Sequence, residues 1–413
     1  MNEDNRPEFR PEQTDQQFNT TTVDSAIPSF GQGAKTKLLI PAKLAHHHRR
    51  FREWFAGLSK GQKVLFFIIV AVVTVAIVGG IFYALRPKTA PVTSGQKLNV
   101  QNKLAAAPNT VPSTLTGLQV DKSVNERPVT GVMVENSIEA RPQSGLDQAG
   151  VVFEAEAEGG ITRFLALFQD SQPSYIGPVR SARPYYIQWC QGFDCSYAHV
   201  GGSPEALQDI KDWGVKDLNQ FYGAAYFQRI SSRAAPHNVY TSIEKLNQFE
   251  SSKGYTTSNY SGFVRLDKEG KPDPAAAVAH SINFDYAGTK YDVHYDYDAA
   301  SNTYKRSEAG APHNVVDATG TTSQLSPKVV VAMAVTKTQG ALDASNAYYS
   351  NYQVVGSGAV KIFQNGTVVD GTWTKSSPTS QITFTDTAGK AIKLNPGQTW
   401  ISVLQTTASA SYN

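Results

Sequence analysis

Three arginines are the residues whose type and spacing point most directly to binding chemistry. Arg180, Ser181 and Arg183 lie in segment 177–184, and Arg163 lies shortly before it. Pro184 suits the first turn of a helix, where free amides and the helix dipole favour an anion. Guanidinium groups can add two parallel hydrogen bonds to a carboxylate or phosphate. The alternative is that these arginines form ion pairs with nearby glutamates.

A second segment of the same kind follows. Residues 197–200 predict a strand, and Gly201, Gly202 and Ser203 lead into a helix that begins at Pro204, which forms a potential anion nest. The segment has neither the Lys-Ser/Thr of a P-loop nor a G-x-S-x-G elbow, so nucleotide hydrolysis and serine-esterase chemistry are not supported. The expected ligand-binding residues are Arg163, Arg180, Ser181, Arg183, Gly201, Gly202, Ser203 and Asn238.

An acid–base reading of the same region is also possible. His199 or His237 could act as a general base, with Glu158 as the acid. No nucleophile and base are spaced diagnostically, so binding is favoured over catalysis. The pentapeptide at 235–239 recurs at 311–315, which brings in His313 as well, although a match of five residues is weak evidence for duplication.

The two cysteines, Cys190 and Cys195, are expected to form a local disulfide in an oxidising compartment. Free thiols are the second reading. A zinc site that adds His199 would lack a fourth ligand, so no metal and no cofactor are predicted.

The elements that position these residues start with a hairpin. Residues 151–158 alternate apolar and acidic side chains, Gly159 and Gly160 can form a two-residue turn, and residues 161–168 return. In the simplest register Glu156 lies opposite Arg163. One face would then be apolar core, and the glutamates on the other face would either pair with cations or face a cleft.

The run 64–85 is 22 residues long and contains no Asp, Glu, Lys, Arg or His, so it is long and apolar enough for a single transmembrane helix. The run begins too late for a cleaved signal peptide, so a retained anchor is expected. Residues 1–120 contain 14 Lys+Arg and 7 Asp+Glu, whereas residues 121–413 contain 24 and 28. These charges give no reason to expect nucleic acid binding. Six Lys and Arg residues lie at 43–63, before the apolar run, and four lie more spread out at 86–103, after it, which favours a cytoplasmic N terminus and an extracytoplasmic remainder.

The chain divides further by composition. We expect a disordered cytoplasmic tail at 1–42, a basic amphipathic juxtamembrane segment at 43–63 and a flexible stalk at 86–127. An α/β domain is expected at 128–262 and a mainly β domain at 280–405, so the fold class is α+β. Capping signals predict helices from Pro204 and from the Thr241–Glu244 capping box, and an Asn365-Gly366 turn predicts a hairpin.

Several of these motifs together resemble the YerB-like family of bacterial envelope proteins, which are often lipoproteins and contain N- and C-terminal parts of unknown function. The resemblance covers most of 120–405, and is carried by segments 127–129, 140–146, 158–163, 177–184, 198–207, 236–238, 371–373 and 396–400. It implies an extracytoplasmic location and supplies no activity. This chain has no lipobox cysteine, so its expected anchor is the spanning helix.

The sequence therefore predicts a membrane-anchored extracytoplasmic protein that binds an anionic envelope ligand, such as a cell-wall polymer. Its expected partners are the lipid bilayer and an envelope polymer or protein. An envelope hydrolase or transferase is one alternative, and a scaffold for a protein partner is another.

Overall fold

The computed structural model describes residues 54–63, 66, 110–286, 288–342 and 346–413. Residues 54–56 and 60–63 are helical, and Gly57 lies in a turn between them. The apolar run 64–85 lies outside the described residues, apart from Phe66. Within the described part of the chain, no helix combines the length and the apolar character needed to span a bilayer.

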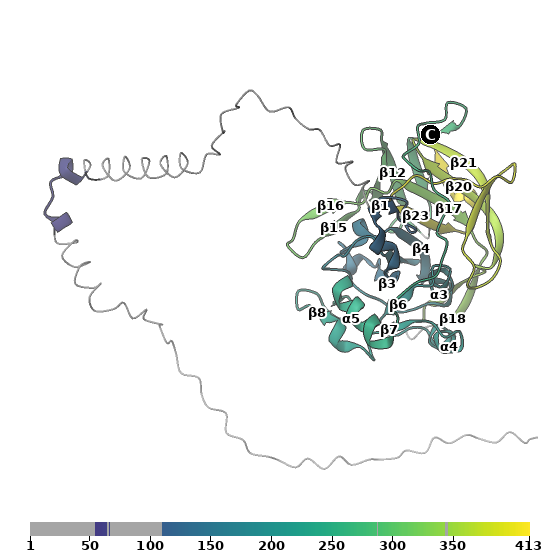
Figure 1. The fold of residues 1–413 in the computed structure, drawn as a ribbon, viewed down its shortest axis with the longest axis horizontal. Coiled ribbons are helices and arrows are strands. Elements are labelled where there is room, and N and C mark those ends of the chain that lie inside the picture. Colours follow the sequence, from purple (N-terminus) through teal and green to yellow (C-terminus); the bar gives the residue numbers. More distant parts are fainter. Residues whose placement is uncertain (1–53, 64–65, 67–109, 287, 343–345) are drawn as a thin grey trace, which may run out of the picture. The chain divides into compact units, whose positions relative to one another are not determined.

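Strands dominate the folded unit, and most of them form one 13-stranded sheet (Figure 1). Along its main path, five strands from the second half of the chain are followed by five strands from the first half. Its main path runs, in order, through β10 (Ala277–Val278), β21 (Thr367–Lys375), β20 (Gly356–Gln364), β17 (Val329–Ala334), β23 (Thr399–Leu404), β4 (Val151–Glu158), β5 (Ile161–Phe168), β3 (Thr130–Glu135), β6 (Ser196–His199) and β7 (Asp217–Asn219). Three more strands join it at the side: β18 (Lys337–Leu342), β19 (Tyr348–Tyr352) and β22 (Thr383–Asp386).

The central strands β4 and β23 are parallel and belong to opposite halves of the sequence, with Val152 beside Trp400 and Phe153 beside Ile401. Both faces of these strands are buried, because consecutive residues enter two different hydrophobic clusters. The folded unit is therefore α/β-like in its first half and β-rich in its second, but the two halves share one sheet.

Different elements pack on the two faces of the large sheet. On one face lie α3 (Pro184–Gln191) and α4 (Pro204–Asp212), which contribute Trp189 and Ile210 to the core. On the other lie α5 (Ile243–Lys253) and a five-stranded sheet. That sheet consists of β14 (Ala311–Pro312), β13 (Thr303–Glu308), β12 (Val293–Asp298), β11 (Ser281–Phe284) and β24 (Ala410–Tyr412). In Figure 1 the helices gather near β6 and β7, away from β20 and β21.

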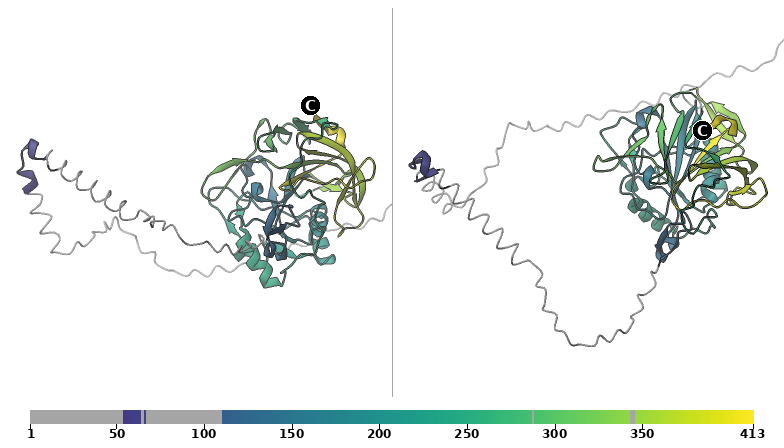
Figure 2. Two further views of the ribbon diagram at one scale, coloured as in Figure 1. Left: turned by 45° about the horizontal axis from the view of Figure 1, so that its top comes forward. Right: turned by 90° about the horizontal axis from the view of Figure 1, so that it is seen from above.

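The remaining elements are short. They are the strand pairs β1 (Thr110–Pro112) with β2 (Gln119–Asp121), β8 (Gln228–Arg229) with β9 (Val239–Tyr240), and β15 (Asn314–Val316) with β16 (Thr322–Gln324). The 3-10 helices are η1 (Lys122–Glu126), η2 (Ile138–Ala140), η3 (Leu146–Gln148), η4 (Ala224–Tyr226) and η5 (Thr407–Ser409). Figure 2 shows the same folded unit from two further sides.

The expected helix starts agree with the structure in one case and differ by one residue in another. Ser203 caps α4 by accepting a hydrogen bond from the Ala206 amide, and Pro204 occupies the first turn. The cap of α5 is Ser242 rather than Thr241, because the Thr241 hydroxyl instead donates to the Tyr226 carbonyl.

Two other expectations are wrong. The stalk was expected to reach residue 127, but residues 110–127 are folded, and Leu115 is completely buried in the core. The β4–β5 hairpin does turn at Gly159 and Gly160, yet Glu156 lies opposite Thr162 rather than Arg163. A bulge between Glu156 and Glu158 adds one residue to β4 and shifts the register.

Candidate anion-binding site

Charged side chains gather at one edge of the large sheet, where the parallel strands β3, β4 and β6 end. Glu135 is the last residue of β3, and Glu158 is the last residue of β4. Arg163 lies near the start of the antiparallel strand β5, opposite Glu135. The carboxyl edge of parallel strands is where ligands of α/β proteins commonly bind.

One half of this cluster is built around Glu158. Arg163 and Arg183 each place one terminal guanidinium nitrogen 2.5 Å from a different oxygen of this carboxylate. Burial alone would raise the pKa of Glu158, but the two guanidinium charges outweigh it and lower the pKa below its ordinary value. Glu158 is therefore ionised and holds the side chains of Arg163 and Arg183 in place, which contradicts its expected role as a general acid.

The other half is built around Glu135. Its carboxylate lies 3.0 Å from Arg180 Nε and 3.0 Å from His237 Nδ1, and it accepts a hydrogen bond from the Ser137 hydroxyl. Arg180 comes from the segment before α3, and His237 comes from the loop between β8 and β9. The fold thus brings Arg163, Arg180 and Arg183 of the binding hypothesis together with His237 of the acid–base hypothesis. We call these four residues, together with Glu135 and Glu158, the arginine cluster.

The arginine cluster carries more positive than negative charge. Three guanidinium groups face two carboxylates, before any proton on His237 is counted. Burial lowers the pKa of Arg180, and the neighbouring charge of Arg163 lowers it further, against the opposing effect of Glu135. A negative group beside Arg180 would relieve this repulsion.

The cluster also has hydrogen-bonding capacity that the protein does not use. The buried Nε groups of Arg163, Arg180 and Arg183 have no hydrogen-bond acceptor among the described residues. Arg180 Nε is close to Glu135 but is not directed at it for a hydrogen bond. Buried donors of this kind usually have partners, so an oxygen-rich ligand would satisfy the site.

His237 is the only one of the two proposed bases with the geometry of a base. Its Nδ1 lies 3.0 Å from both Glu135 oxygens, which orients the ring, and its side chain is 21% exposed. Because the Glu135 carboxylate contacts Nδ1, Nε2 is the ring nitrogen that could accept a proton.

His199 is not accessible for proton transfer. It is completely buried, with Nδ1 2.6 Å from the Gly201 carbonyl oxygen and Nε2 2.9 Å from Asp217. Both partners accept hydrogen bonds, so both ring nitrogens are occupied in holding the ends of β6 and β7 to the glycine loop. The expected role of His199 as a base is therefore wrong.

The remaining predicted ligand-binding residues serve the fold. The Gly201 amide donates to Asn219, the Ser203 amide donates to the Ala182 carbonyl, and the Ser203 hydroxyl caps α4, so the expected nest is occupied by protein atoms. The side chain of Asn238 bonds to Arg229 and Ile230 within its own loop. The Ser181 carbonyl accepts a hydrogen bond from Arg163, which helps to orient that arginine.

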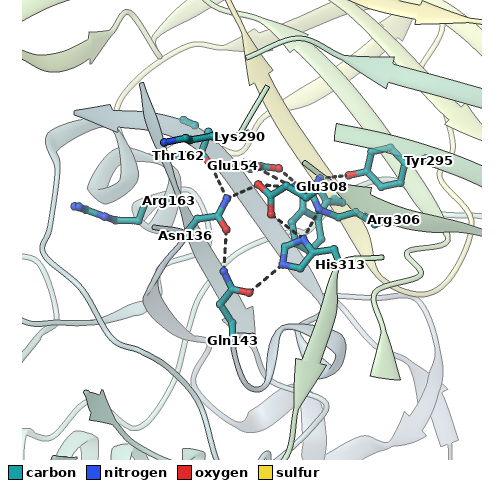
Figure 3. A network of polar contacts seen from close by, with 12 residues as sticks. Asn136, Gln143, Glu154, Thr162, Arg163, Lys290, Tyr295, Arg306, Glu308 and His313 are labelled. Carbon is teal, nitrogen blue, oxygen red and sulfur yellow. Dashed lines mark hydrogen bonds and ion pairs between the residues drawn. The ribbon is translucent and has the colours of Figure 1, made fainter. Parts of the chain in front are cut away.

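On the opposite face of the end of β3 lies a second, buried polar network (Figure 3). Arg306 of β13 pairs with Glu154 of β4 at 3.0 Å, and both side chains are completely buried. Trp400 donates from its indole to Glu154, and the Tyr295 hydroxyl accepts from Arg306. Glu154 therefore does not reach into a cleft, as one reading of the glutamate row expected, but joins the two halves of the chain.

Asn136 connects this network to the end of β3. Its amide donates to Glu308 at 2.7 Å and to Thr162 at 2.6 Å, and its oxygen accepts from Gln143. Glu135 and Asn136 thus direct their side chains to opposite faces, one toward the arginine cluster and the other toward the buried network. Arg163 points away from this network in Figure 3.

His313 is neutral in this network. Arg306 Nε donates to His313 Nδ1, so the ring proton lies on Nε2, which donates to Gln143. Burial lowers the pKa of His313 well below its ordinary value, and the charge of Arg306 adds to this effect. The contact of 3.3 Å between His313 Nδ1 and the Glu308 carboxylate is therefore not an ion pair. Burial raises the pKa of Glu308 itself to about 7.

Cys190 and Cys195 form a disulfide, the first of the three expected possibilities. It closes the loop between α3 and β6, and the two residues lie at the edge of the sheet opposite the arginine cluster. Among the described residues, no group of three or more His, Cys, Asp or Glu could hold a metal ion.

Comparison with known proteins places this chain in a family. Residues 115–256 match the N-terminal domain, and residues 282–401 the C-terminal domain, of a family described as protein of unknown function DUF3048. The chain belongs to this YerB-like family.

A particular relative is YerB of Bacillus subtilis (strain 168), described as "Putative lipoprotein YerB". It is 32% identical over 316 residues, which cover 74% of this chain and 91% of the relative. The crystal structure of Bacillus subtilis YerB is similar with a TM-score of 0.64 and 30% identity, and the match covers 73% of this chain and 99% of that one.

Sequence reasoning missed Glu135, Arg306 and Glu308. Glu135 ends an apolar strand directly after Val134, a position from which carboxyl-edge site residues often come. Tyr304, Arg306 and Glu308 alternate with Lys305 and Ser307, so a period of two would have placed them on one face of β13.

Proposed function

We propose that this chain is a membrane-anchored extracytoplasmic protein that binds an anionic cell-envelope ligand through the arginine cluster. The observation that carries the proposal is the excess of guanidinium over carboxylate groups at a partly exposed sheet edge, where the Nε group of Arg180 has no hydrogen-bond acceptor among the described residues. The description of a relative as a lipoprotein and the predicted apolar span 64–85 support the location.

Arg180 is the residue best placed to meet the ligand. Its side chain is 24% exposed, whereas those of Arg163 and Arg183 are nearly buried and share Glu158. An incoming phosphate or carboxylate would compete with Glu135 for Arg180 and add a charge-assisted hydrogen bond. Arg163 and Arg183 would then act mainly through their charge.

The test is calorimetric titration of the full chain, purified in an uncharged detergent, with synthetic poly(glycerol phosphate). Arg180→Ala should weaken binding roughly ten- to hundredfold, since a charged hydrogen bond contributes about 1.5–3 kcal/mol. Arg229→Ala is the matched control, because Arg229 is exposed and bonds only to Asn238 among the described residues. Failure of the wild type to bind, or equal loss in both variants, would contradict the proposal.

A second candidate function is hydrolysis or group transfer on the same ligand, favoured by the orientation of His237 against Glu135. In that case His237→Ala should abolish the release of glycerol phosphate from the polymer while the affinity stays unchanged. If the polymer is bound but no release is detected with the wild type, the binding function stands alone.

A further inference from the structure

Beside the arginine cluster lies a cavity of about 350 Å³, between the β18–β19 hairpin and the end of β4. This volume falls within the range of small-ligand sites. Its lining is rich in aromatic, amide and hydroxyl groups, and includes Thr338, Gln339, Tyr348, Tyr349, Ser350 and Gln405.

The cavity has no net charge of its own. Its two charged lining residues, Glu156 and Lys337, pair with each other. Glu156 also accepts hydrogen bonds from the Gly160 amide and the Ser350 hydroxyl, so its carboxylate is held in place by the protein. A ligand group in this cavity would meet neutral donors and acceptors and the surfaces of tyrosine rings.

Tyr349 joins the cavity to the arginine cluster. Its backbone pairs with Glu158, and the guanidinium of Arg183 lies over its ring, 4.6 Å from the ring centre. The same tyrosine therefore forms a wall of the cavity and a support for Arg183. A ligand long enough to touch both regions would present an uncharged part to the hairpin and an anionic part to the arginines.

We propose that this cavity is a subsite for an N-acetylhexosamine residue, so that the ligand of the arginine cluster is an acidic glycan containing amino sugars. The inference rests on the proposed function and names its ligand class. The apolar face of a sugar ring packs on an aromatic side chain, as other amphipathic groups do. The amides of Gln339 and Gln405 match the hydrogen-bonding needs of an acetamido group and ring hydroxyls.

Tyr348 is the residue to test. It is 48% exposed at the cavity and has no part in the arginine cluster, whereas removal of Tyr349 would also disturb Arg183. Tyr222→Ala is the matched control, because Tyr222 is 76% exposed in the loop after β7 and does not line the cavity.

The experiment is saturation-transfer NMR and calorimetry of the full chain with chitotetraose, an uncharged tetramer of N-acetylglucosamine, in a detergent without a sugar headgroup. The wild type and Tyr222→Ala should bind it equally. Tyr348→Ala should bind about tenfold more weakly, as expected for the loss of one aromatic packing contact. Arg180→Ala should leave chitotetraose binding unchanged.

The two probes separate this inference from the proposed function, because poly(glycerol phosphate) has charge without sugar rings and chitotetraose has rings without charge. Absence of chitotetraose binding, or equal binding by the wild type and Tyr348→Ala, overturns the subsite even if the polyanion is retained. Binding of chitotetraose without binding of the polyanion supports the sugar subsite, but overturns the anion-binding function and with it the acidic character of the proposed glycan.

Discussion

Glu250 is a buried carboxyl group whose ionisation should make stability depend on pH. It projects from α5 to the amino ends of β3 and β6, where it is 1% exposed and accepts a hydrogen bond from Thr130 at 2.8 Å. Burial raises its pKa to about 7, and the hydroxyls of Thr130 and Ser196 and the charge of Lys216 offset this only in part. The perturbation we consider is Glu250→Gln.

The pKa of Glu250 in the folded chain lies above its value of about 4.3 in an unfolded chain. The folded state therefore holds a proton that the unfolded state gives up. This stabilisation is complete below about pH 4.3 and is lost as the pH rises through about 7. Between pH 5 and pH 8 the loss amounts to about 2.5 kcal/mol, from roughly 1.4 kcal/mol per pKa unit.

The assay is urea denaturation of the full chain at pH 5, 6, 7 and 8, followed by tryptophan fluorescence. Glutamine does not ionise, so the stability of Glu250→Gln relative to the wild type should increase with pH by about 2.5 kcal/mol. Glu308, with a pKa also raised to about 7, titrates in both proteins and cancels in the difference. Glu244→Gln, on the exposed side of α5, should show no such trend.

A difference between Glu250→Gln and the wild type that stays constant from pH 5 to pH 8 would refute this reasoning. It would mean that the Glu250 carboxyl keeps one protonation state over this range, and that its hydrogen bonds and the charge of Lys216 compensate fully for burial.

Two further perturbations test the parts that hold the site together. Arg306→Met should lower the free energy of unfolding by about 3–5 kcal/mol, because it leaves Glu154 buried without its cation, and adding Glu154→Gln should restore part of the loss. Lys305→Met, on the exposed side of the same strand, should change the free energy of unfolding by less than about 1 kcal/mol. Equal effects of Arg306→Met and Lys305→Met in urea denaturation would contradict the ion-pair argument. Replacing Cys190 and Cys195 by serine should lower the free energy of unfolding by about 2 kcal/mol, because the disulfide closes only a short loop in the unfolded chain. A variant with unchanged stability in urea denaturation would show that the disulfide does not constrain the unfolded chain.

Local signals in the sequence predicted local structure well. Ser203 and Pro204 start α4, Pro184 starts α3, and Asn365-Gly366 forms the turn between β20 and β21. Each of these features depends on residues only a few positions apart, so the backbone preferences of the residues themselves decide the outcome.

The pairing of distant strands could not be predicted in this way. Apolar runs predict strands at 329–335 and 400–404, but they do not reveal that the second strand lies between the first and β4. The same limit applies to the site. The sequence singled out Arg163, Arg180, Arg183 and His237 by type. Glu135, the partner of Arg180 and His237, instead comes from a strand whose pattern indicates only apolar core.

The strand β23 comes from the second half of the chain and lies directly beside β4 of the first half. A protease cut between α5 and β10 should therefore leave a molecule that stays associated through backbone hydrogen bonds. Either half made alone would expose an open edge of unpaired amides and carbonyls and tend to aggregate. Truncated alleles that lack the second half should consequently lose the folded arrangement of the arginine cluster, although every arginine of that cluster is still encoded.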